Sequence, residues 1–201
     1  MRKEITTHFS TADPAIYTLI QKISIDPIKP SKDFFRSLCR EIIGQQLAGS
    51  AADAIFSRFL KLFPHRRVTA KKLLDFSDDA IREAGTSWAK VRSLKDLADN
   101  VVKKNIHLKS LTTLSNEDVM KELVKVKGIG PWTAEMFLMF SLAREDIFSF
   151  GDLGLQNAIQ KLYKLRRKPT RKQLEILSSK WSPYRTYACL LLWQNLDTKI
   201  A

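Results

Sequence analysis

The chain has 201 residues and is 44% hydrophobic, so it can bury one substantial core or two small ones. Its 34 lysines and arginines against 21 aspartates and glutamates give a formal net charge of +13, which attracts a polyanion such as nucleic acid. The sequence contains no apolar run long enough to span a membrane, and its first residues do not predict a secretory signal. We therefore expect no membrane partner, and a location in the cytoplasm of a prokaryote or the nucleus of a eukaryote.

The cysteines and histidines do not follow a metal-binding pattern. Cys39 and Cys189 are too few for a four-cysteine zinc or iron-sulfur site and are expected to be buried thiols. His8, His65 and His107 stand alone, without the spacing that brings several ligands to one metal. The sequence predicts no catalytic transition metal.

The spacing of the apolar residues predicts an all-α protein. They recur at helical intervals along nearly the whole chain, and β-branched runs between turn residues are missing. Asp13 and Ser31 are expected to cap the first two helices, and Ser77 to cap the fifth, which ends at Gly85. The first part of the chain is expected to form helices over residues 15–23, 32–46, 50–63, 70–76, 78–84 and 87–105.

The second part of the chain shows the same helical spacing. Ser115 and Asp152 occupy N-cap positions before two of its predicted helices. Residues 164–172 carry six basic side chains and a proline, which predicts an exposed loop. The expected helices cover residues 117–126, 131–143, 153–163, 173–181 and 183–196.

Residues 123–134, LVKVKGIGPWTA, have the form of two helices joined by a Gly-x-Gly turn. Glycines let a turn expose its backbone amides, so those of Gly128, Gly130 and Thr133 are expected to bind one phosphate, with help from the helix dipole. The alternative is a plain helix end and tight turn before a proline. The basic composition favours a DNA contact.

Two segments, VKGIGPWTAEMF (126–137) and DIFSFGDLGLQ (146–156), carry a family resemblance. They resemble the helix-hairpin-helix DNA glycosylases, and within them the 3-methyladenine DNA glycosylase II branch. Further matches at 41–52, 84–98 and 181–194 extend the resemblance over about residues 10–196. It implies one glycosylase unit over 1–201, built from two interleaved helical subdomains with the active-site cleft between them and the hairpin at about 121–140.

The resemblance implies that Asp152 is the catalytic aspartate. Breaking an N-glycosidic bond builds positive charge on the sugar, and a fixed carboxylate stabilises that charge and helps to orient the attacking water. The alternative is a structural role as the N-cap of the following helix, and both roles are compatible.

The resemblance also implies a pocket for a flipped base. Trp132 stands where bifunctional relatives carry the lysine that attacks the sugar, so no lyase activity is expected. Trp132 and Trp193 correspond to aromatic walls, and an indole stacks well on a cationic methylated purine. The alternative for Trp193 is ordinary core packing. Lys125 and Lys127 are expected to contact phosphates.

Two further roles follow from the family pattern. Gln46 or Leu47 is expected to fill the hole that a flipped base leaves in the stack, although a plain connecting loop is the alternative. The main-chain carbonyls of Val124, Val126 and Gly128 correspond to ligands of a structural Na⁺ or K⁺. No cofactor is expected to be required.

These observations predict a monofunctional glycosylase that acts as a monomer on double-stranded DNA containing damaged bases. No obvious acid accompanies Asp152, which favours 3-methyladenine and 7-methylguanine, because these cationic bases leave with little help. Hypoxanthine and ethenoadenine are further candidates. The alternatives are a bifunctional glycosylase/lyase for oxidised bases, which needs the hairpin lysine, and a non-enzymatic helix-hairpin-helix module, which needs neither the aromatic walls nor Asp152.

Overall fold

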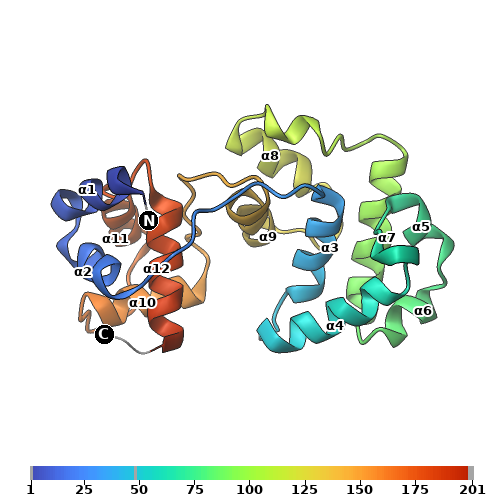
Figure 1. Ribbon diagram of the computed structural model, residues 1–201, viewed down its shortest axis with the longest axis horizontal. Coiled ribbons are helices and arrows are strands. Elements are labelled where there is room, and N and C mark those ends of the chain that lie inside the picture. The colour runs from blue at the N-terminus through green and yellow to red at the C-terminus, as the bar shows by residue number, and fades with distance from the viewer. Residues whose placement is uncertain (1, 48, 199–201) are drawn as a thin grey trace. The chain divides into compact units, whose positions relative to one another are not determined.

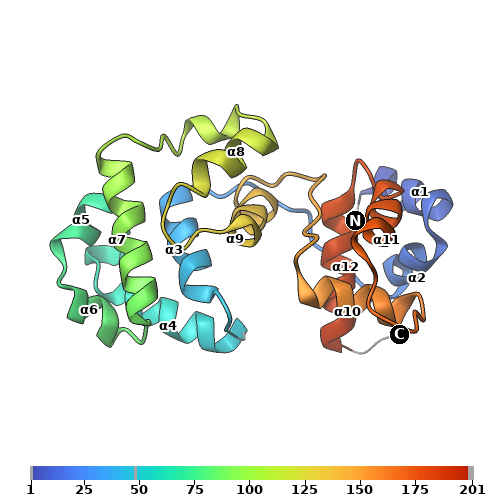
Figure 2. The ribbon, with the colours of Figure 1, turned by 180° about the vertical axis from the view of Figure 1, so that it is seen from behind.

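The computed structural model describes residues 2–47 and 49–198, and over these residues it contains helices and no strands. The all-α prediction is confirmed. The chain divides into two compact units: Pro30–Leu142, here called the hairpin unit, and Met1–Lys29 with Ala143–Ala201, here called the split unit. Figures 1 and 2 show the helices of each unit from opposite sides.

The hairpin unit packs around α7, which contacts α3, α5 and α6. Its core includes Leu38 and Ile42 of α3 and Leu94 and Leu97 of α7, all fully buried. Its elements are α3 (Phe34–Gly44), α4 (Gly49–Lys61), η1 (Pro64–Arg66), α5 (Ala70–Asp75), α6 (Asp78–Glu83), α7 (Trp88–Val102), η2 (Ser110–Thr112), α8 (Asn116–Leu123), α9 (Pro131–Met136) and η3 (Phe137–Ser141).

The split unit joins the N-terminal helices to the C-terminal part of the chain. Its elements are α1 (Lys3–Ala12), α2 (Pro14–Lys22), α10 (Leu153–Leu162), α11 (Arg171–Ser179) and α12 (Arg185–Thr198). Helix α12 packs against both α2 and α10, so it connects the two halves of this unit. Residues 166–168, in the basic stretch before α11, are exposed as predicted.

The predicted N-caps at Asp13, Ser77, Ser115 and Asp152 are confirmed, because each side chain accepts a hydrogen bond from an amide in the first turn of its helix. The prediction for Ser31 is wrong. Helix α3 is capped by Asp33, whose carboxylate accepts from the Arg36 amide at 3.0 Å. Ser31 lies two residues before this cap, and its hydroxyl accepts a hydrogen bond from the Asp33 amide instead of from an amide of α3.

Helix α1 was not expected from the sequence. Only Ile5 and Phe9 are fully buried along it, and both lie in a segment rich in threonine and charged residues. The helix is held by tertiary contacts, since α1 packs on α2 and a ring nitrogen of His8 lies 3.0 Å from the carbonyl oxygen of Lys180. The formation of α1 therefore depends on residues far from it in the sequence, and no local pattern predicts it.

A buried carboxylate ties the two halves of the split unit together. Asp13 is 5% exposed, and it caps α2 through the amides of Ala15 and Ile16. Its other oxygen accepts from the Tyr163 hydroxyl at 2.5 Å and the Trp181 indole N–H at 2.8 Å. Because every bond to a buried charge lowers the cost of burying it, this network stabilises the packing of α2 against the C-terminal helices.

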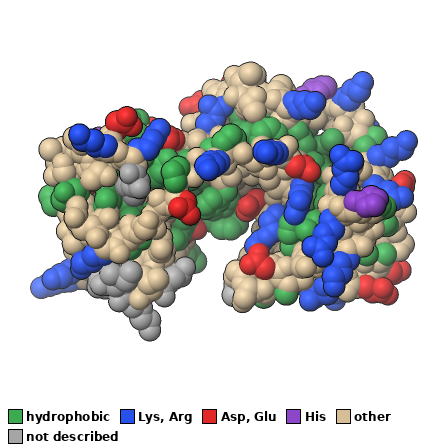
Figure 3. Space-filling view, in the orientation of Figure 1, with side chains coloured by type: hydrophobic (Ala, Val, Ile, Leu, Met, Phe, Trp, Pro, Cys, Tyr) green, Lys and Arg blue, Asp and Glu red, His purple; other side chains and the backbone are tan. Residues whose placement is uncertain are grey.

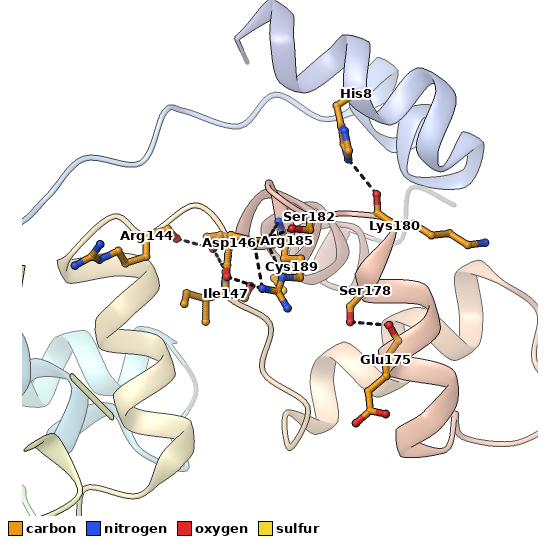
Figure 4. A network of polar contacts seen from close by, with 11 residues as sticks. His8, Arg144, Asp146, Ile147, Glu175, Ser178, Lys180, Ser182, Arg185 and Cys189 are labelled. Atoms are coloured by element: carbon orange, nitrogen blue, oxygen red, sulfur yellow. Dashed lines mark hydrogen bonds and ion pairs between the residues drawn. The ribbon is translucent and has the colours of Figure 1, made fainter. Parts of the chain in front are cut away.

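The segment that follows Leu142 is fixed to the start of α12 (Figure 4). The Arg185 guanidinium donates to both carboxylate oxygens of Asp146, at 2.6 and 3.0 Å. Burial raises the pKa of Asp146, but the hydrogen bonds from Arg185 and Ser182 outweigh it, so the pKa lies below its usual value. The Thr186 hydroxyl donates to the Arg144 carbonyl and accepts from the Ile147 amide. This segment leads directly to Asp152.

Neither cysteine forms a disulfide, and both are fully buried, as predicted. Burial raises the pKa of the Cys39 thiol far above its usual range, so it stays protonated and unreactive. Within the part of the chain that the structure describes, no helix is long and apolar enough to cross a membrane.

Candidate active site and DNA interface

The predicted hairpin connects α8 to α9. Helix α8 ends at Leu123, and α9 begins at Pro131 after the Gly-x-Gly turn. Gly128 has φ +80°, and a Cβ there would lie 2.1 Å from the Ser93 hydroxyl oxygen, so only glycine fits. Gly130 faces open space, with no atom within 4 Å of the point that a Cβ would occupy. The two glycines therefore differ: Gly128 is required by the fold, whereas Gly130 leaves the surface clear for a ligand.

The hairpin offers backbone donors at its turn. Among the described residues, the amides of Gly128, Gly130 and Thr133 find no hydrogen-bond acceptor. The Lys127 amide is different, because it donates to the Asp96 carboxylate at 2.8 Å and so anchors the turn to α7. Open amides at the start of a helix favour an anion such as phosphate.

The two lysines beside the turn form only weak ion pairs. The Lys125 ammonium lies 2.5 Å from Glu122, and that of Lys127 lies 4.0 Å from Asp96, with the Lys127 side chain 82% exposed. Exposed pairs of this kind contribute little stability, so a DNA phosphate can compete for both lysines. Further Lys and Arg side chains gather on the face of the hairpin unit seen in Figure 3.

Gln45 is a site residue that sequence reasoning missed. Its side-chain amide donates to the Gly128 carbonyl at 2.8 Å and to the Thr133 hydroxyl at 2.9 Å. The Lys90 ammonium donates to the carbonyls of Ile43 and Gln45, both at 2.9 Å. These contacts fix the end of α3 against the hairpin, and the bond from Gln45 to Gly128 spans 83 residues of sequence, which no local pattern reveals.

The candidate wedge residues follow directly after Gln45. Gln46 is exposed and has φ +58°, a backbone conformation that side chains other than glycine adopt rarely. Leu47 is 37% exposed, which is unusual for leucine in so well-packed a unit. Both side chains are therefore available to a ligand on the unit that carries the hairpin.

Trp132 is the second residue of α9 and is 37% exposed. It lies one position before Thr133, whose amide is open. An exposed indole beside an anion site can stack on a nucleobase.

Asp152 begins helix α10 in the split unit, and the structure holds its carboxylate in place. The side chain is 9% exposed, and Oδ1 accepts from the Leu155 amide at 2.7 Å and from the Trp193 indole N–H at 3.1 Å. The cap role is confirmed. A carboxylate oriented by two donors is also suited to stabilising a developing positive charge.

Trp193 is half-buried on α12, and its hydrogen bond to Asp152 was not predicted. A Cβ on Gly154 would lie 3.4 Å from the Trp193 ring and 3.0 Å from Asp152 Oδ1. The glycine therefore leaves room for the indole to approach the carboxylate. This contact makes Trp193 a positioning residue for Asp152, whereas its expected role as a pocket wall stays a prediction.

Replacing Trp193 by phenylalanine is expected to slow base release about tenfold, because one hydrogen bond to a charged group is lost while an aromatic ring remains. The single-turnover rate and the affinity for abasic DNA should be measured together. A loss of positioning lowers the rate and leaves the affinity unchanged. An unchanged rate would show that the hydrogen bond has no part in the chemistry.

Hairpin amides that face outward on a basic, all-α chain define a helix-hairpin-helix DNA-binding protein. The chain belongs to the HhH-GPD superfamily of base excision DNA repair proteins, whose family model matches residues 39–183. The family expected from the sequence is therefore confirmed.

Named relatives and solved structures agree with this membership. The putative DNA-3-methyladenine glycosylase YfjP of Bacillus subtilis is 30% identical over 97% of this chain and 69% of its own length. DNA-3-methyladenine glycosylase 1 of Schizosaccharomyces pombe is 35% identical over 82% of this chain and 73% of its own. The solved S. pombe 3-methyladenine DNA glycosylase in complex with abasic DNA superposes with a TM-score of 0.88 and 30% identity, over 99% and 98% of the two chains.

Proposed function

We propose that this chain is a monofunctional DNA glycosylase that releases alkylated purines, 3-methyladenine and 7-methylguanine above all, from duplex DNA. The observation that carries the proposal is the Asp152 carboxylate, oriented by the Leu155 amide and the Trp193 indole. The sequence resemblance implies that this residue is the catalytic aspartate. The names of the relatives support 3-methyladenine as a substrate.

The chemistry follows from the charge of Asp152. As the bond between C1′ and the base nitrogen breaks, its electron pair leaves with the base and the sugar becomes positively charged. The carboxylate stabilises that charge, and a water molecule adds to C1′ and loses a proton. The products are a free base and an abasic site in an intact strand.

The preference for alkylated purines follows from the leaving group and the aromatic surface. A purine alkylated at N3 or N7 is already cationic, so it departs as a neutral molecule without needing a proton. Trp132 provides an exposed indole on which a cationic ring can stack.

DNA is held through its backbone in this proposal. The amides of Gly128, Gly130 and Thr133 bind one phosphate, and Lys125 and Lys127 contact its neighbours. Gln46 or Leu47 fills the gap left by the flipped base. The protein acts as a monomer, at the nucleoid of a bacterium or in the nucleus of a eukaryote.

A structural Na⁺ or K⁺ in the hairpin is part of the proposal. The carbonyl of Val126 accepts from the Ile129 amide, and that of Gly128 accepts from Gln45. A carbonyl oxygen has two lone pairs, so these bonds leave both groups, together with the Val124 carbonyl, able to accept a monovalent cation as well. The cation would brace the turn, and the amides facing the phosphate would be left unchanged.

The proposed activity is tested by incubating the protein with DNA methylated by a simple alkylating agent and separating the released bases by chromatography. Free 3-methyladenine and 7-methylguanine are expected, in amounts that depend on protein concentration. Binding without any base release would instead favour a non-enzymatic helix-hairpin-helix module.

No covalent intermediate is expected, because Trp132 occupies the position of the lysine that would form a Schiff base. Borohydride added during base release should therefore trap no protein–DNA adduct, and the strand should stay unbroken until alkali or heat is applied. A bifunctional glycosylase serves as the positive control. A trapped adduct with this protein would contradict the monofunctional assignment and point to another lysine.

A further inference from the structure

A cavity of about 390 Å³ lies within the hairpin unit, on the side of α3 that faces η3. Its volume is in the range of small-molecule sites, about 300–1,000 Å³. Its walls combine aromatic, hydroxyl and charged side chains, among them Ser37, Arg40 and Glu41 of α3, Phe56 of α4, and Phe140 and Ser141 of η3. No role assigned above uses this cavity.

Glu41 is the unusual member of this wall. Among the described residues its carboxylate forms no hydrogen bond and no ion pair, although it is only partly accessible to solvent. Burial raises its pKa, and the positive charge of Arg40 only partly opposes this. Arg40 is itself engaged elsewhere, since its guanidinium lies 2.6 Å from Asp53 of α4. The Glu41 carboxyl group can therefore hold a proton. Within the described chain it has no hydrogen-bond or ion-pair partner, so it is available to a ligand.

The cavity and the proposed base-stacking surface belong to the same unit and are formed by elements that contact each other. Gln45, one helical turn after Glu41 on α3, donates to the Gly128 carbonyl and to Thr133 in the hairpin. On the opposite wall, Phe140 lies eight residues after Trp132 on one continuous helix. The cavity is thus bounded by α3 and by the continuous helix of α9 and η3, and both of these contact or belong to the hairpin.

A local change in helical geometry is expected to bring Phe140 nearer to the face of Trp132. Eight residues of α-helix would rotate a side chain well past its starting direction. Residues 137–141 form a π-helical turn, in which the Leu142 amide donates to the Phe137 carbonyl, and such a turn rotates less per residue. Phe140 is 42% exposed, and Trp132 is 37% exposed. The helix therefore carries two exposed aromatic side chains, and the second of them lines the Glu41 cavity.

We propose that Glu41 is a general acid that protonates neutral purine lesions, of which hypoxanthine is the simplest, as their glycosidic bond breaks. The Glu41 carboxyl transfers its proton to a ring nitrogen of the base, and the electron pair of the breaking C1′–N9 bond is taken up by the base. Water adds to C1′ and loses a proton, and Glu41 regains one from solvent. This role rests on the proposed function, and it extends the substrates to bases that cannot leave without a proton.

The direction of the pH dependence follows from the groups around Glu41. Arg36, Arg40, Lys32 and Asp33 line the same cavity, Asp53 of α4 is paired with Arg40, and η3 carries no titratable side chain. The titratable residue of α9, Glu135, is not part of the cavity wall, and on α7 the Lys90 ammonium is bound to the Ile43 and Gln45 carbonyls. Since only protonated Glu41 acts as a donor, hypoxanthine release should fall as the pH rises through the raised pKa of Glu41. Release of 7-methylguanine needs no donor and should not show this fall.

The test compares Glu41→Gln with wild type on two duplexes of identical sequence, one with hypoxanthine and one with 7-methylguanine at the same position. Single-turnover release of hypoxanthine is expected to fall about 100-fold, the lower end of what general acid catalysis contributes. Release of 7-methylguanine should change less than about twofold by the same argument. Glu83→Gln, on the exposed surface of α6, is the matched control and should change neither rate.

A second variant distinguishes loss of the proton donor from a general disturbance of the fold in Glu41→Gln. Glu41→Asp keeps a carboxyl group in the cavity, so it should retain part of the hypoxanthine activity together with the fall at high pH, whereas Glu41→Gln should lose that fall. Equal losses on both lesions in Glu41→Gln, or hypoxanthine release unaffected by it, would overturn the role of Glu41. So would a wild-type protein that releases 7-methylguanine but no hypoxanthine. Failure of wild type to release either base would instead refute the proposed function itself.

Discussion

Replacing Asp152 by asparagine is expected to slow single-turnover release of 7-methylguanine by about three powers of ten. A carboxylate about 4 Å from the sugar cation, at an effective dielectric constant of about 20, contributes roughly 4 kcal/mol. Asparagine removes that charge but little else. Its side-chain oxygen can still accept from the Leu155 amide and the Trp193 indole, and it caps a helix about as well as aspartate.

The control for this variant is a measurement of its stability and of its DNA binding. The melting temperature and the affinity for abasic DNA should stay close to those of wild type, because both hydrogen bonds to the side chain are retained. If the asparagine variant releases the base within about tenfold of wild type, a difference of about 1.4 kcal/mol, Asp152 acts only as a helix cap and the catalytic assignment fails.

Replacing Gly130 by aspartate is expected to weaken binding to duplex DNA by about 100-fold, since it places a negative charge beside the proposed phosphate contact. The fold should tolerate the change, because nothing lies within 4 Å of a Cβ at this position and its backbone is extended. Gly130→Ala, which adds only a methyl group, should bind more tightly than Gly130→Asp.

The matched control for charge is Ser179→Asp on the exposed end of α11, which adds the same charge to the unit that does not carry the hairpin and should leave DNA affinity nearly unchanged. Affinities need to be measured at several salt concentrations, because wild-type binding through phosphates should weaken steeply as salt increases. Full affinity in Gly130→Asp, or binding insensitive to salt, would show that the hairpin does not hold the DNA.

The parts of the structure that could be predicted depend on short-range chemistry. Asp13, Ser77, Ser115 and Asp152 were identifiable as caps because a capping side chain bonds to amides only two or three residues away. The misplaced cap at Ser31 shows the limit of the same rule. Two cap-forming residues, Ser31 and Asp33, lie close together, and only the tertiary position of α3 decides between them.

Long-range contacts explain what the sequence did not reveal. Helix α1 has too few apolar residues to stand out, and it is stable because Ile5 and Phe9 are buried by the rest of the split unit. The hydrogen bond from Trp193 to Asp152 spans 41 residues, and neither side chain signals the other in the sequence. Glu41 likewise gives no signal, since a single glutamate on an amphipathic helix usually faces solvent, whereas here residues of α4 and η3 complete the cavity that it lines.

The most direct test of the proposed activity is excision of a single 7-methylguanine from a 5′-labelled duplex by the wild-type protein, followed with and without alkali. We expect free 7-methylguanine, a full-length labelled strand without alkali, and cleavage at the lesion position after alkali. Because alkali also attacks 7-methylguanine itself, the same duplex without protein is treated in parallel. Equal cleavage with and without protein would show that no base was released and would contradict the enzymatic assignment. Cleavage without alkali would contradict the monofunctional mechanism.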